Sequence, residues 1–589
     1  MRTENNNRLF IMFVFILSGM YTYSFNNSAV TFILTAVSSA LMAYYFIKSE
    51  NPERENVTDV VIKTMLLYSF AVFAVHFVNI TGFPGDFIAD ERNEIVEAYN
   101  RLQGEKGLFS YSKRFGASLL YTSTAAVMLF LAVFRENLDM LRFIPAGITG
   151  CTAVIVYLLG NEIKDKKTGI AFLFAYAVSG WAFYLARMRL EHVFVPFFVF
   201  LAVLFFYKMV KKPSLLKLSA VCAACFLGVF TYASFILMLP LFVYMFFEYR
   251  KEAGVKITAA GIISMAVIGA VFLAINLING ETIQWAAAQT VKGAAEAETG
   301  LLQRFVNVFE LFVKPVITSN AFIKNSPILS FPESVLLASG LLLMISKFKD
   351  RFNRVMLAGF FIAVLTVISG KSIDHHWRHI LVLPFIIIIS GMFIGYAMNK
   401  KGFYLIVLIS MLAGINIGFL YFTGYGIQNN NPAVYKEIAA KINLLSGGKD
   451  CVVLHEPFPY GQYTAYLRTK SAYQKRQKNG EVFFIIPASW KKETVKLFPG
   501  STVHYFYDTK YPSTRVIALV KYQPKTPEEY SEFIAVKKQL AAATMHMWDL
   551  NYNKVLDIQA AESAGPAVSF MNAVMYIKAS EAASVGKNN

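Results

Sequence analysis

Two adjacent carboxylates, Asp90 and Glu91, form the pair whose position in this sequence most suggests chemistry. They follow an apolar segment by about ten residues, and they open a stretch that places Ile95, Ala98 and Tyr99 on one helical face. A charge beside hydrocarbon costs free energy unless it faces water, protein or a substrate. We therefore interpret the pair as a candidate site. Acidic residues in the first turn of a helix also suit its dipole without any function, which is the alternative interpretation.

Two further groups of polar residues lie at the ends of apolar segments. Lys113 and Arg114 belong to the same loop as the acidic pair. The other group is Arg187, Arg189 and Glu191, which stand between two apolar segments. Arginines in such a place often only anchor a helix at the membrane surface. A glutamate is a poor anchor, so we interpret this group as substrate-binding.

A histidine-rich segment, 371–379, runs directly into another apolar segment. His375, His376 and His379 are spaced so that pairs of them share one helical face, and neutral imidazoles are common metal ligands. No carboxylate motif beside them fixes a coordination geometry. Clustered histidine and arginine at an interface can equally hold a phosphate or a lipid headgroup. We therefore assign His376 and Arg378 to substrate binding and expect no cofactor, with a divalent metal ion as the open alternative.

The elements that carry these groups are membrane spans. The chain has 589 residues, of which 56% are hydrophobic and 15% aromatic, and its mean hydropathy is +0.46, far too apolar for a soluble protein of this size. Length and apolarity predict a polytopic α-helical membrane protein with about 13 spans. The predicted spans are 9–25, 29–47, 62–80, 143–160, 170–186, 192–209, 215–231, 233–249, 257–278, 333–346, 355–370, 379–398 and 403–423.

The distribution of basic residues predicts the topology. Five short loops on one side contain about 16 lysines and arginines, and the loops facing them contain few, so the first set is expected in the cytoplasm. Asp90 and Glu91 then lie outside, provided that the apolar run 118–134 does not cross the membrane. The net charge of +18 is largely a consequence of this topology. It therefore calls for no nucleic-acid partner.

A second domain is predicted after the last span. A polar linker near 424–432 separates a membrane domain, 1–426, from a domain at 427–589. The membrane domain has two large outer loops, 82–118 and 279–332. The second domain reads as α/β, with helices near 432–445 and 489–498 and strands near 451–454, 482–486, 503–507 and 515–522. An odd number of spans places it outside. No phosphate-binding glycine motif follows its strands, so a nucleotide-binding role has no support.

One cysteine pair has the spacing of a redox or zinc motif. Cys222 and Cys225 are separated by two residues, but they lie inside an apolar helix and no second pair accompanies them. Small apolar packing is the better interpretation of both side chains. We expect no structural disulfide in the chain.

Taken in order, these segments resemble those of a known superfamily. The matching features are Asp90-Glu91 followed by Ala98 and Tyr99, the short apolar helix 118–134, the run from Ala186-Arg187 to Glu191, and the segment Trp377-Arg378-His379-Ile380-Leu381-Val382-Leu383-Pro384. The chain resembles the glycosyltransferase C superfamily of polytopic membrane enzymes. The resemblance lies within the branch of the dolichyl-phosphate-mannose protein mannosyltransferases and the lipid A aminoarabinose transferase, and it covers roughly residues 60 to 425.

The resemblance implies an inverting transfer of a hexosyl or related sugar. The donor would be a polyprenyl-phosphate-linked sugar, and the acceptor a lipid, a glycan or a protein at the outer face of the membrane. Asp90 matches the catalytic position of the family, where a carboxylate takes a proton from the attacking hydroxyl. Glu91 and Glu191 would orient the acceptor. Arg187, Arg189 and Arg378 would hold the phosphate that leaves.

Two other classes of protein remain open. A lipid or oligosaccharide flippase or transporter should have paired repeats or polar residues near the middle of its spans, and the sequence shows neither. The second alternative is a membrane scaffold whose outer domain binds a partner. The expected location is the bacterial inner membrane, with the site and the second domain extracytoplasmic.

Overall fold

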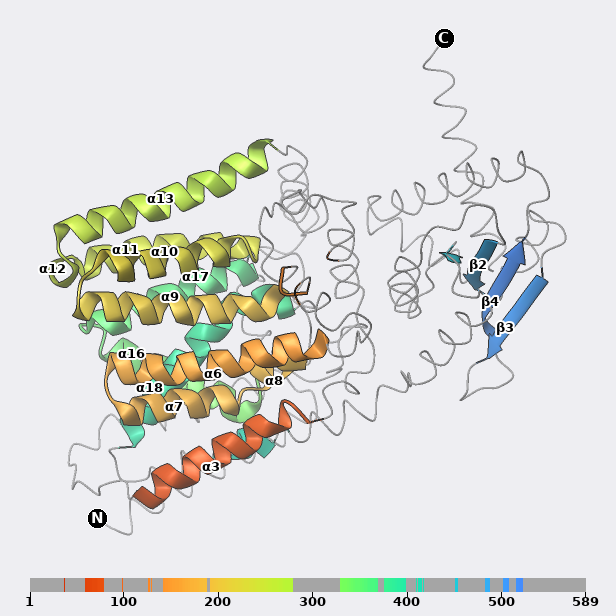
Figure 1. Cartoon of the computed structure of the whole chain (residues 1–589). Coiled ribbons are helices and arrows are strands. Elements are labelled where there is room, and N and C mark those ends of the chain that lie inside the picture. The colour runs from red at the N-terminus through yellow and green to blue at the C-terminus, as the bar shows by residue number, and fades with distance from the viewer. Residues whose placement is uncertain are drawn as a thin grey trace. The chain divides into compact units, whose positions relative to one another are not determined.

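The computed structural model describes the helical part of the chain and four strands. The described ranges are 59–78, 141–187, 191–278, 329–368, 376–398, 451–453, 482–487, 502–507 and 515–522, with short pieces at 37, 98, 125–127, 129, 409, 411–415 and 417. The helices labelled in Figure 1 belong to one compact unit and the strands to another. Each unit is described by itself.

The helical unit is a bundle in which some helices pack against their neighbours in sequence and others against helices from distant parts of the chain (Figure 1). Its α-helices are α3 (Asp59–Val75), α6 (Phe143–Ile163), α7 (Lys166–Ala177), α8 (Gly180–Arg187), α9 (Phe194–Lys211), α10 (Leu215–Val229), α11 (Met238–Glu248), α12 (Arg250–Ala253), α13 (Val255–Ile278), α16 (Phe331–Ser346), α17 (Arg351–Ile368) and α18 (Leu383–Ala397). Three 3₁₀ turns lead into α9, α11 and α18, namely η2 (Glu191–Val193), η3 (Ala233–Leu237) and η4 (His376–Val382).

The described helices have the composition of membrane spans. Four are long and apolar enough to cross a bilayer: Phe143–Ile163, Phe194–Lys211, Val255–Ile275 and His379–Ala397. The bent pair α7 and α8 would make a fifth. Large apolar side chains such as Ile263 and Val267 on α13 are more than half exposed, as expected for a lipid-facing surface. Several predicted spans lie outside the described residues, so the number of about 13 stays a prediction.

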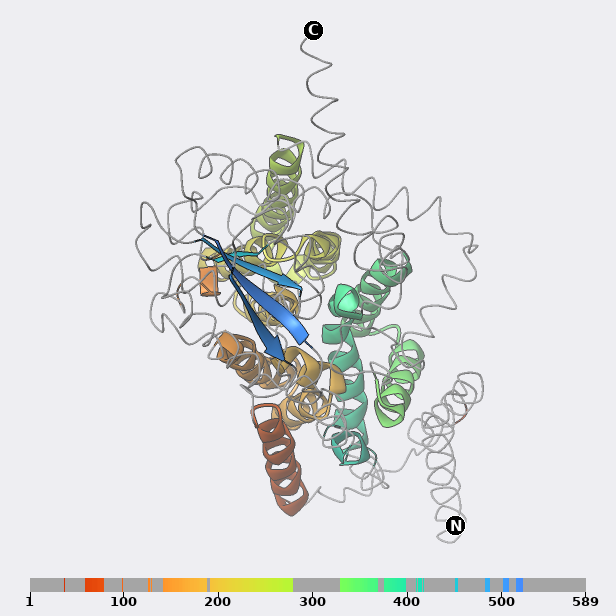
Figure 2. The ribbon, with the colours of Figure 1, turned by 90° about the vertical axis from the view of Figure 1, so that its right-hand side faces the viewer.

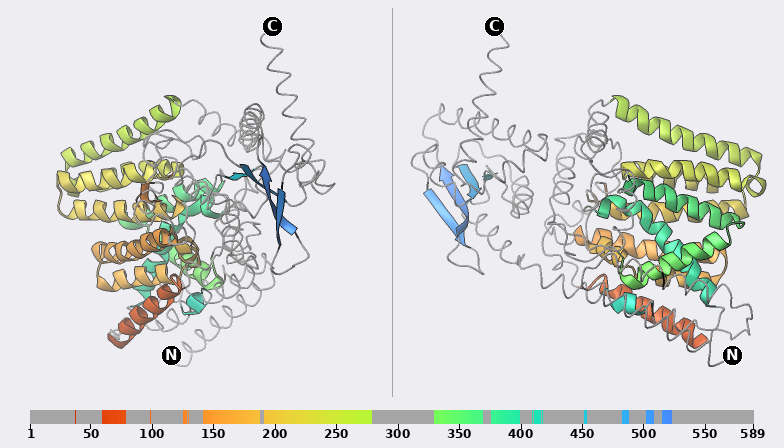
Figure 3. Two further views of the ribbon diagram at one scale, coloured as in Figure 1. Left: turned by 45° about the vertical axis from the view of Figure 1, so that its right-hand side comes forward. Right: turned by 180° about the vertical axis from the view of Figure 1, so that it is seen from behind.

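The centre of the bundle is built on close contacts between α7, α16 and α18. In the segment His379–Ala397, which joins the end of η4 to α18, 89% of the most apolar stretch is buried inside the protein. Gly340 on α16 lies against the backbone carbonyl of Ile389, and Gly391 on α18 lies against Phe172, so that an added Cβ at either glycine would meet atoms within 2.6 Å. Small residues allow such approach between helices in a membrane. At the edges, α3 and α13 lie on opposite sides of the bundle (Figure 3).

One predicted span is broken. The sequence predicts a continuous helix over 170–186, but the structure ends α7 at Ala177 and begins α8 at Gly180, with a bend of 64° between them. Ser179 explains the new start, because its Oγ accepts a hydrogen bond from the Ala182 amide at 3.4 Å. A serine side chain competes in this way with the helical backbone and favours the first position of a helix.

The strands form a mixed sheet in the order β1-β2-β4-β3 (Figures 1 and 2). β1 (Cys451–Val453) is parallel to β2 (Val482–Pro487), and β4 (Arg515–Tyr522) pairs antiparallel with both β2 and β3 (Thr502–Tyr507). All four strands lie where the alternating and apolar runs of the sequence predict them. The expected helices near 432–445 and 489–498 lie outside the described residues. The α/β class of this unit and its extracytoplasmic place therefore stay predictions.

Candidate functional site

A short helix, α8, carries one of the predicted cations at its end. All eight residues of α8 are buried, from Gly180 to Arg187. The break after α7 lets this helix leave the direction of the preceding span. Its last residue, Arg187, is fully buried although it is charged. A buried cation costs free energy unless it is hydrogen-bonded, so its partners define what it does.

Arg187 reaches from α8 to the end of α3. Its Nη2 donates hydrogen bonds to the carbonyl oxygens of Val75 and Val78, each at 2.7 Å. The guanidinium also lies over the ring of Phe183, 4.9 Å from the centroid. The last carbonyls of a helix have no partner within the helix. Arg187 therefore closes the C-terminal end of α3 and ties it to α8.

A second buried arginine, Arg142, holds the end of α8 itself. It lies just before α6 and its Nη1 donates to the carbonyl oxygen of Arg187 at 2.7 Å. A cation at the C-terminal end of a helix is favoured by the helix dipole. Two buried arginines in succession thus occupy the C-terminal ends of α3 and α8.

Glu333 occupies the opposite end of α8. Its Oε1 accepts a hydrogen bond from the Gly180 amide at 3.1 Å. Its Oε2 accepts from the Ser330 amide at 2.8 Å and from the Ser330 hydroxyl at 2.6 Å. Together with the return bond from the Glu333 amide to the Ser330 Oγ, these contacts form a capping box at the start of α16. One buried carboxylate therefore joins the starts of α8 and α16.

His76 completes the buried polar group beside Arg187. It follows α3 directly, is 0% exposed, and its Nδ1 lies 3.2 Å from the carbonyl oxygen of Val72. Because a carbonyl only accepts, Nδ1 carries a proton and donates it to this bond. Its edge contact with Phe183 has a centroid distance of 5.4 Å. Nε2 has no hydrogen-bond partner among the described residues.

Two of the predicted polar segments come together next to α8. The turn η2, with Glu191 and His192, contacts α8 and also contacts η4. The turn η4 contains His376, Arg378 and His379. His192 and His379 are buried, and the His192 ring lies 4.4 Å from the ring of Tyr232. Segments almost 200 residues apart in the sequence thus meet at one end of the bundle.

No family model and no curated protein matches the chain. Among solved structures, it is similar to ArnT from Cupriavidus metallidurans bound to undecaprenyl phosphate, with 10% identity, a TM-score of 0.52, and coverage of 77% of this chain and 97% of that one. The Archaeoglobus fulgidus oligosaccharyltransferase in its apo form is also similar, with 11% identity, a TM-score of 0.44, and coverage of 79% and 74%.

The fold is that of the glycosyltransferase C membrane enzymes. The resemblance seen in the sequence is therefore confirmed at the level of the fold. At this identity the likeness says nothing about individual residues. The glycosyltransferase C fold and the local contacts described above are therefore separate lines of evidence.

The structure tests the predicted site residues only in part. The structure describes both the backbone and the side chain of Arg187. For Glu191, His376 and Arg378 it describes the backbone, in η2 and η4. The remaining predicted residues lie outside the described ranges, namely Asp90, Glu91, Lys113, Arg114 and Arg189. Their roles stay predictions.

Sequence reasoning missed three buried groups beside α8: Arg142, Glu333 and His76. Glu333 had a recognisable signal, because Ser330-Phe331-Pro332-Glu333 has the spacing of a capping box before an apolar run. The signal predicts the start of α16 but not the second contact with Gly180. Arg142 stands just before the predicted span 143–160, and His76 lies inside the predicted span 62–80. No pattern in the sequence indicates the partners of either residue.

A metal site is not seen in the described part of the chain, where no group of three or more histidine, cysteine, aspartate or glutamate side chains could hold an ion. His375, one of the three clustered histidines, lies outside the described residues. The divalent-ion alternative at this segment is therefore untested.

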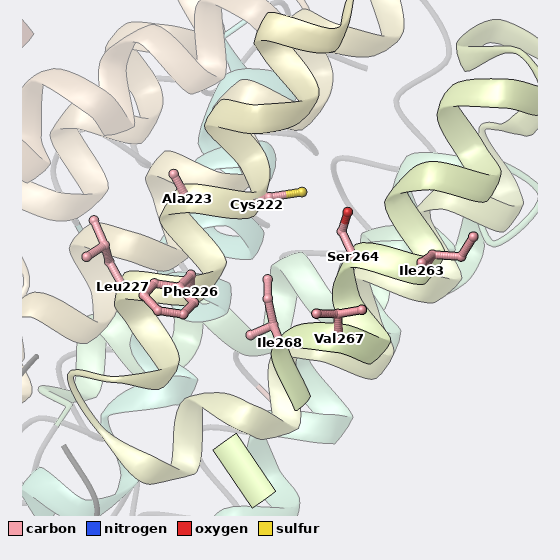
Figure 4. A pocket seen from close by; sticks show the side chains of 8 residues that line it. All are labelled: Cys222, Ala223, Phe226, Leu227, Ile263, Ser264, Val267 and Ile268. Atoms are coloured by element: carbon pink, nitrogen blue, oxygen red, sulfur yellow. The ribbon is translucent and has the colours of Figure 1, made fainter. Parts of the chain in front are cut away.

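A cavity of about 520 Å³ lies between α10 and α13 (Figure 4). It is lined by Cys222, Ala223, Phe226, Leu227, Ile263, Ser264, Val267 and Ile268. In Figure 4 the side chains of Cys222 and Ser264 face each other across it. The lining is mainly apolar and has no charged group, so the cavity suits hydrocarbon. Cys225, one turn further along α10, is buried in the core, in line with a packing role.

Proposed function

We propose that this protein is a glycosyltransferase that moves a sugar from a polyprenyl-phosphate donor to an acceptor at the outer face of the membrane. The observation that carries the proposal is the meeting of η2 and η4 beside the buried end of α8, within a glycosyltransferase C fold. The solved ArnT structure that supports this fold is bound to undecaprenyl phosphate. A lipid phosphate is the kind of group that clustered arginine and histidine bind.

The proposed reaction is a single displacement at the anomeric carbon. Asp90 takes the proton of the acceptor hydroxyl, the acceptor oxygen attacks the anomeric carbon, and the bond from that carbon to the phosphate oxygen breaks. The electron pair of the broken bond stays on the polyprenyl phosphate. Attack from the face opposite to the leaving group inverts the sugar. Glu91 and Glu191 orient the acceptor in this scheme.

Positive charge near η2 and η4 stabilises the departing phosphate. Arg378, His376 and Arg189 are the proposed direct ligands, with Lys113 and Arg114 contributing from the first outer loop. Arg187 contributes differently in our proposal. Its Nη2 already donates to two backbone carbonyls, so it adds positive potential behind η2 and fixes the neighbouring helix ends.

A transfer assay tests this proposal directly. The full-length chain is reconstituted in liposomes with a polyprenyl-phosphate-linked hexose, and the release of free polyprenyl phosphate is measured in the presence of candidate acceptors. The proposal expects release that depends on the acceptor. If the donor instead crosses the bilayer without being consumed, the protein is a flippase, and the glycosyltransferase proposal is wrong.

A further inference from the structure

The helix α8 is hydrogen-bonded at both ends to buried polar side chains from other elements. The Glu333 carboxylate accepts a hydrogen bond from the Gly180 amide at its N-terminal end, and Arg142 donates to the Arg187 carbonyl at its C-terminal end. Arg142 has the sign of charge that the helix dipole favours at a C-terminal end. An isolated helix of eight residues is not stable in itself. The position of α8 therefore depends on the groups that hold it.

Glu333 uses its two carboxylate oxygens for two different helices. Oε2 caps α16 through Ser330, whereas Oε1 accepts from Gly180. Glu333 is 6% exposed, so water does not compete well for these bonds. Capping of α16 needs only Oε2, because the capping box lies entirely within Ser330 and Glu333. The bond to Gly180 is an additional contact that sets the start of α8 after the break.

A displacement of α8 would reach the proposed site by two routes. Arg187 at the end of α8 holds the carbonyls of Val75 and Val78, so the end of α3 follows α8. The turn η2 contacts α8 as well, and η2 in turn contacts η4. In the sequence, the predicted base Asp90 follows Val78 by twelve residues.

Resting on the proposed function, we propose that Glu333 is a positioning residue of the transferase. Its carboxylate fixes the first turn of α8, and through α8 it fixes Arg187, η2 and the end of α3. It touches no substrate in this proposal. Its effect is on where the cationic groups stand when the donor phosphate binds.

Two alanine variants separate this role from simple capping. Ser330→Ala removes the hydroxyl of the capping box but leaves the Glu333 Oε1 on Gly180. Glu333→Ala removes both contacts. Because misplacement of a binding group weakens productive binding steeply, we expect the KM for the polyprenyl-phosphate sugar to rise about tenfold in Glu333→Ala and to stay within about twofold of wild type in Ser330→Ala. A purely structural role would lower the amount of folded enzyme in both variants and leave KM unchanged.

A second variant keeps the test valid if Glu333→Ala does not fold. Glu333→Asp retains a carboxylate in the first turn of α16, where it can still cap Ser330, but it is one methylene shorter and withdraws from Gly180. The same rise in KM is expected. Unchanged KM in every folded Glu333 variant would overturn the positioning role of Glu333. The proposed transferase function would not be affected, provided that the wild-type protein transfers sugar.

Amide hydrogen exchange gives a readout that does not depend on activity. In the full-length chain in nanodiscs, we expect exchange over 180–187 and 76–78 to be faster in Glu333→Asp than in Ser330→Ala. Equal exchange in the two variants would contradict the link between Glu333 and α8. A wild-type protein that fails to bind polyprenyl phosphate would overturn the proposed function, and the exchange result would still decide the role of Glu333.

Discussion

At the scale of single residues, buried ionisable side chains hold the helix ends of the bundle in place. Arg142, Arg187 and Glu333 are all buried, and each of them bonds to a helix end. The sequence places Arg187 correctly at the end of an apolar segment but cannot show its partners. Those partners are backbone carbonyls from a helix more than 100 residues earlier, and backbone groups have no signature in the sequence. Burial of the guanidinium was unpredictable for the same reason.

The catalytic prediction concerns Asp90. Asp90→Asn retains the size of the side chain and removes the basic oxygen, so turnover should fall by about 10²–10⁴-fold while donor affinity stays nearly unchanged. Initial rates of sugar transfer and equilibrium binding of polyprenyl phosphate measure the two quantities. If Asp90 only suits a helix dipole, the variant will transfer sugar at the wild-type rate.

Arg142 offers a stability prediction with a matched control. Arg142→Met leaves the buried Arg187 carbonyl without its charged donor, which should cost about 1–3 kcal/mol of unfolding free energy. Arg250 also donates Nη1 to a carbonyl, that of Phe247, but on an exposed surface. Arg250→Met should therefore change stability by less than about 0.5 kcal/mol. Thermal unfolding in detergent compares the stabilities of the two variants. Equal losses of stability would show that the buried hydrogen bond of Arg142 stabilises the protein no more than the exposed one of Arg250.

At the scale of elements, the sequence predicts the apolar spans well and their interruptions poorly. The segment 170–186 has the length and apolarity of one span, yet it is two helices, α7 and α8. Apolarity does not reveal the break, because every residue from Phe174 to Arg187 is buried on either side of it. The signal was Ser179 followed by Gly180, a good start for a new helix. That signal is too common in membrane helices to decide the matter alone.

The connection between α12 and α17 should depend on pH. Arg351 lies 2.6 Å from Glu252, and its guanidinium holds the pKa of Glu252 below the ordinary value of 4.5. A lowered pKa in the folded state means that the carboxylate stabilises the fold above about pH 4.5 and loses this effect as the pH falls further.

Glu252→Gln tests this connection. Because both partners are partly exposed, the variant should lower the unfolding free energy by less than about 1 kcal/mol at pH 7. The difference from wild type should shrink as the pH falls below 4.5. A series of thermal unfolding midpoints from pH 3 to pH 7 measures it. A difference that is constant across the series would show that charge is not the cause.

At the scale of the whole molecule, composition and segment order predict the glycosyltransferase C fold. The order of short motifs along 60–425 was enough for this, because the fold is a succession of spans with their polar segments at fixed places. The meeting of η2 and η4 follows from that succession. The exact contacts around α8 do not, since they depend on which side chains fill a particular space.

The topology is a prediction at the same scale. Positions Thr299, Ser372 and Ser501 are expected on the side of Asp90, because the basic loops lie on the other side. Each is changed to cysteine in a background without the four native cysteines, and labelled from one side with a membrane-impermeant reagent. Lys349→Cys is the control that should stay unlabelled in sealed cells. Labelling of the three positions from different sides would overturn the predicted topology.

Neighbouring helices of the bundle differ in length, and this has a consequence for the bilayer. α10 has 15 residues and rises about 22 Å, whereas α13 beside it has 24 residues and rises about 36 Å. The hydrocarbon core of a bilayer is about 30 Å thick. A helix longer than this tilts, and a shorter one thins the lipid around it. The membrane beside α10 is therefore expected to be locally thin, which brings lipid headgroups, and any phosphate among them, deeper toward the protein than in the surrounding bilayer.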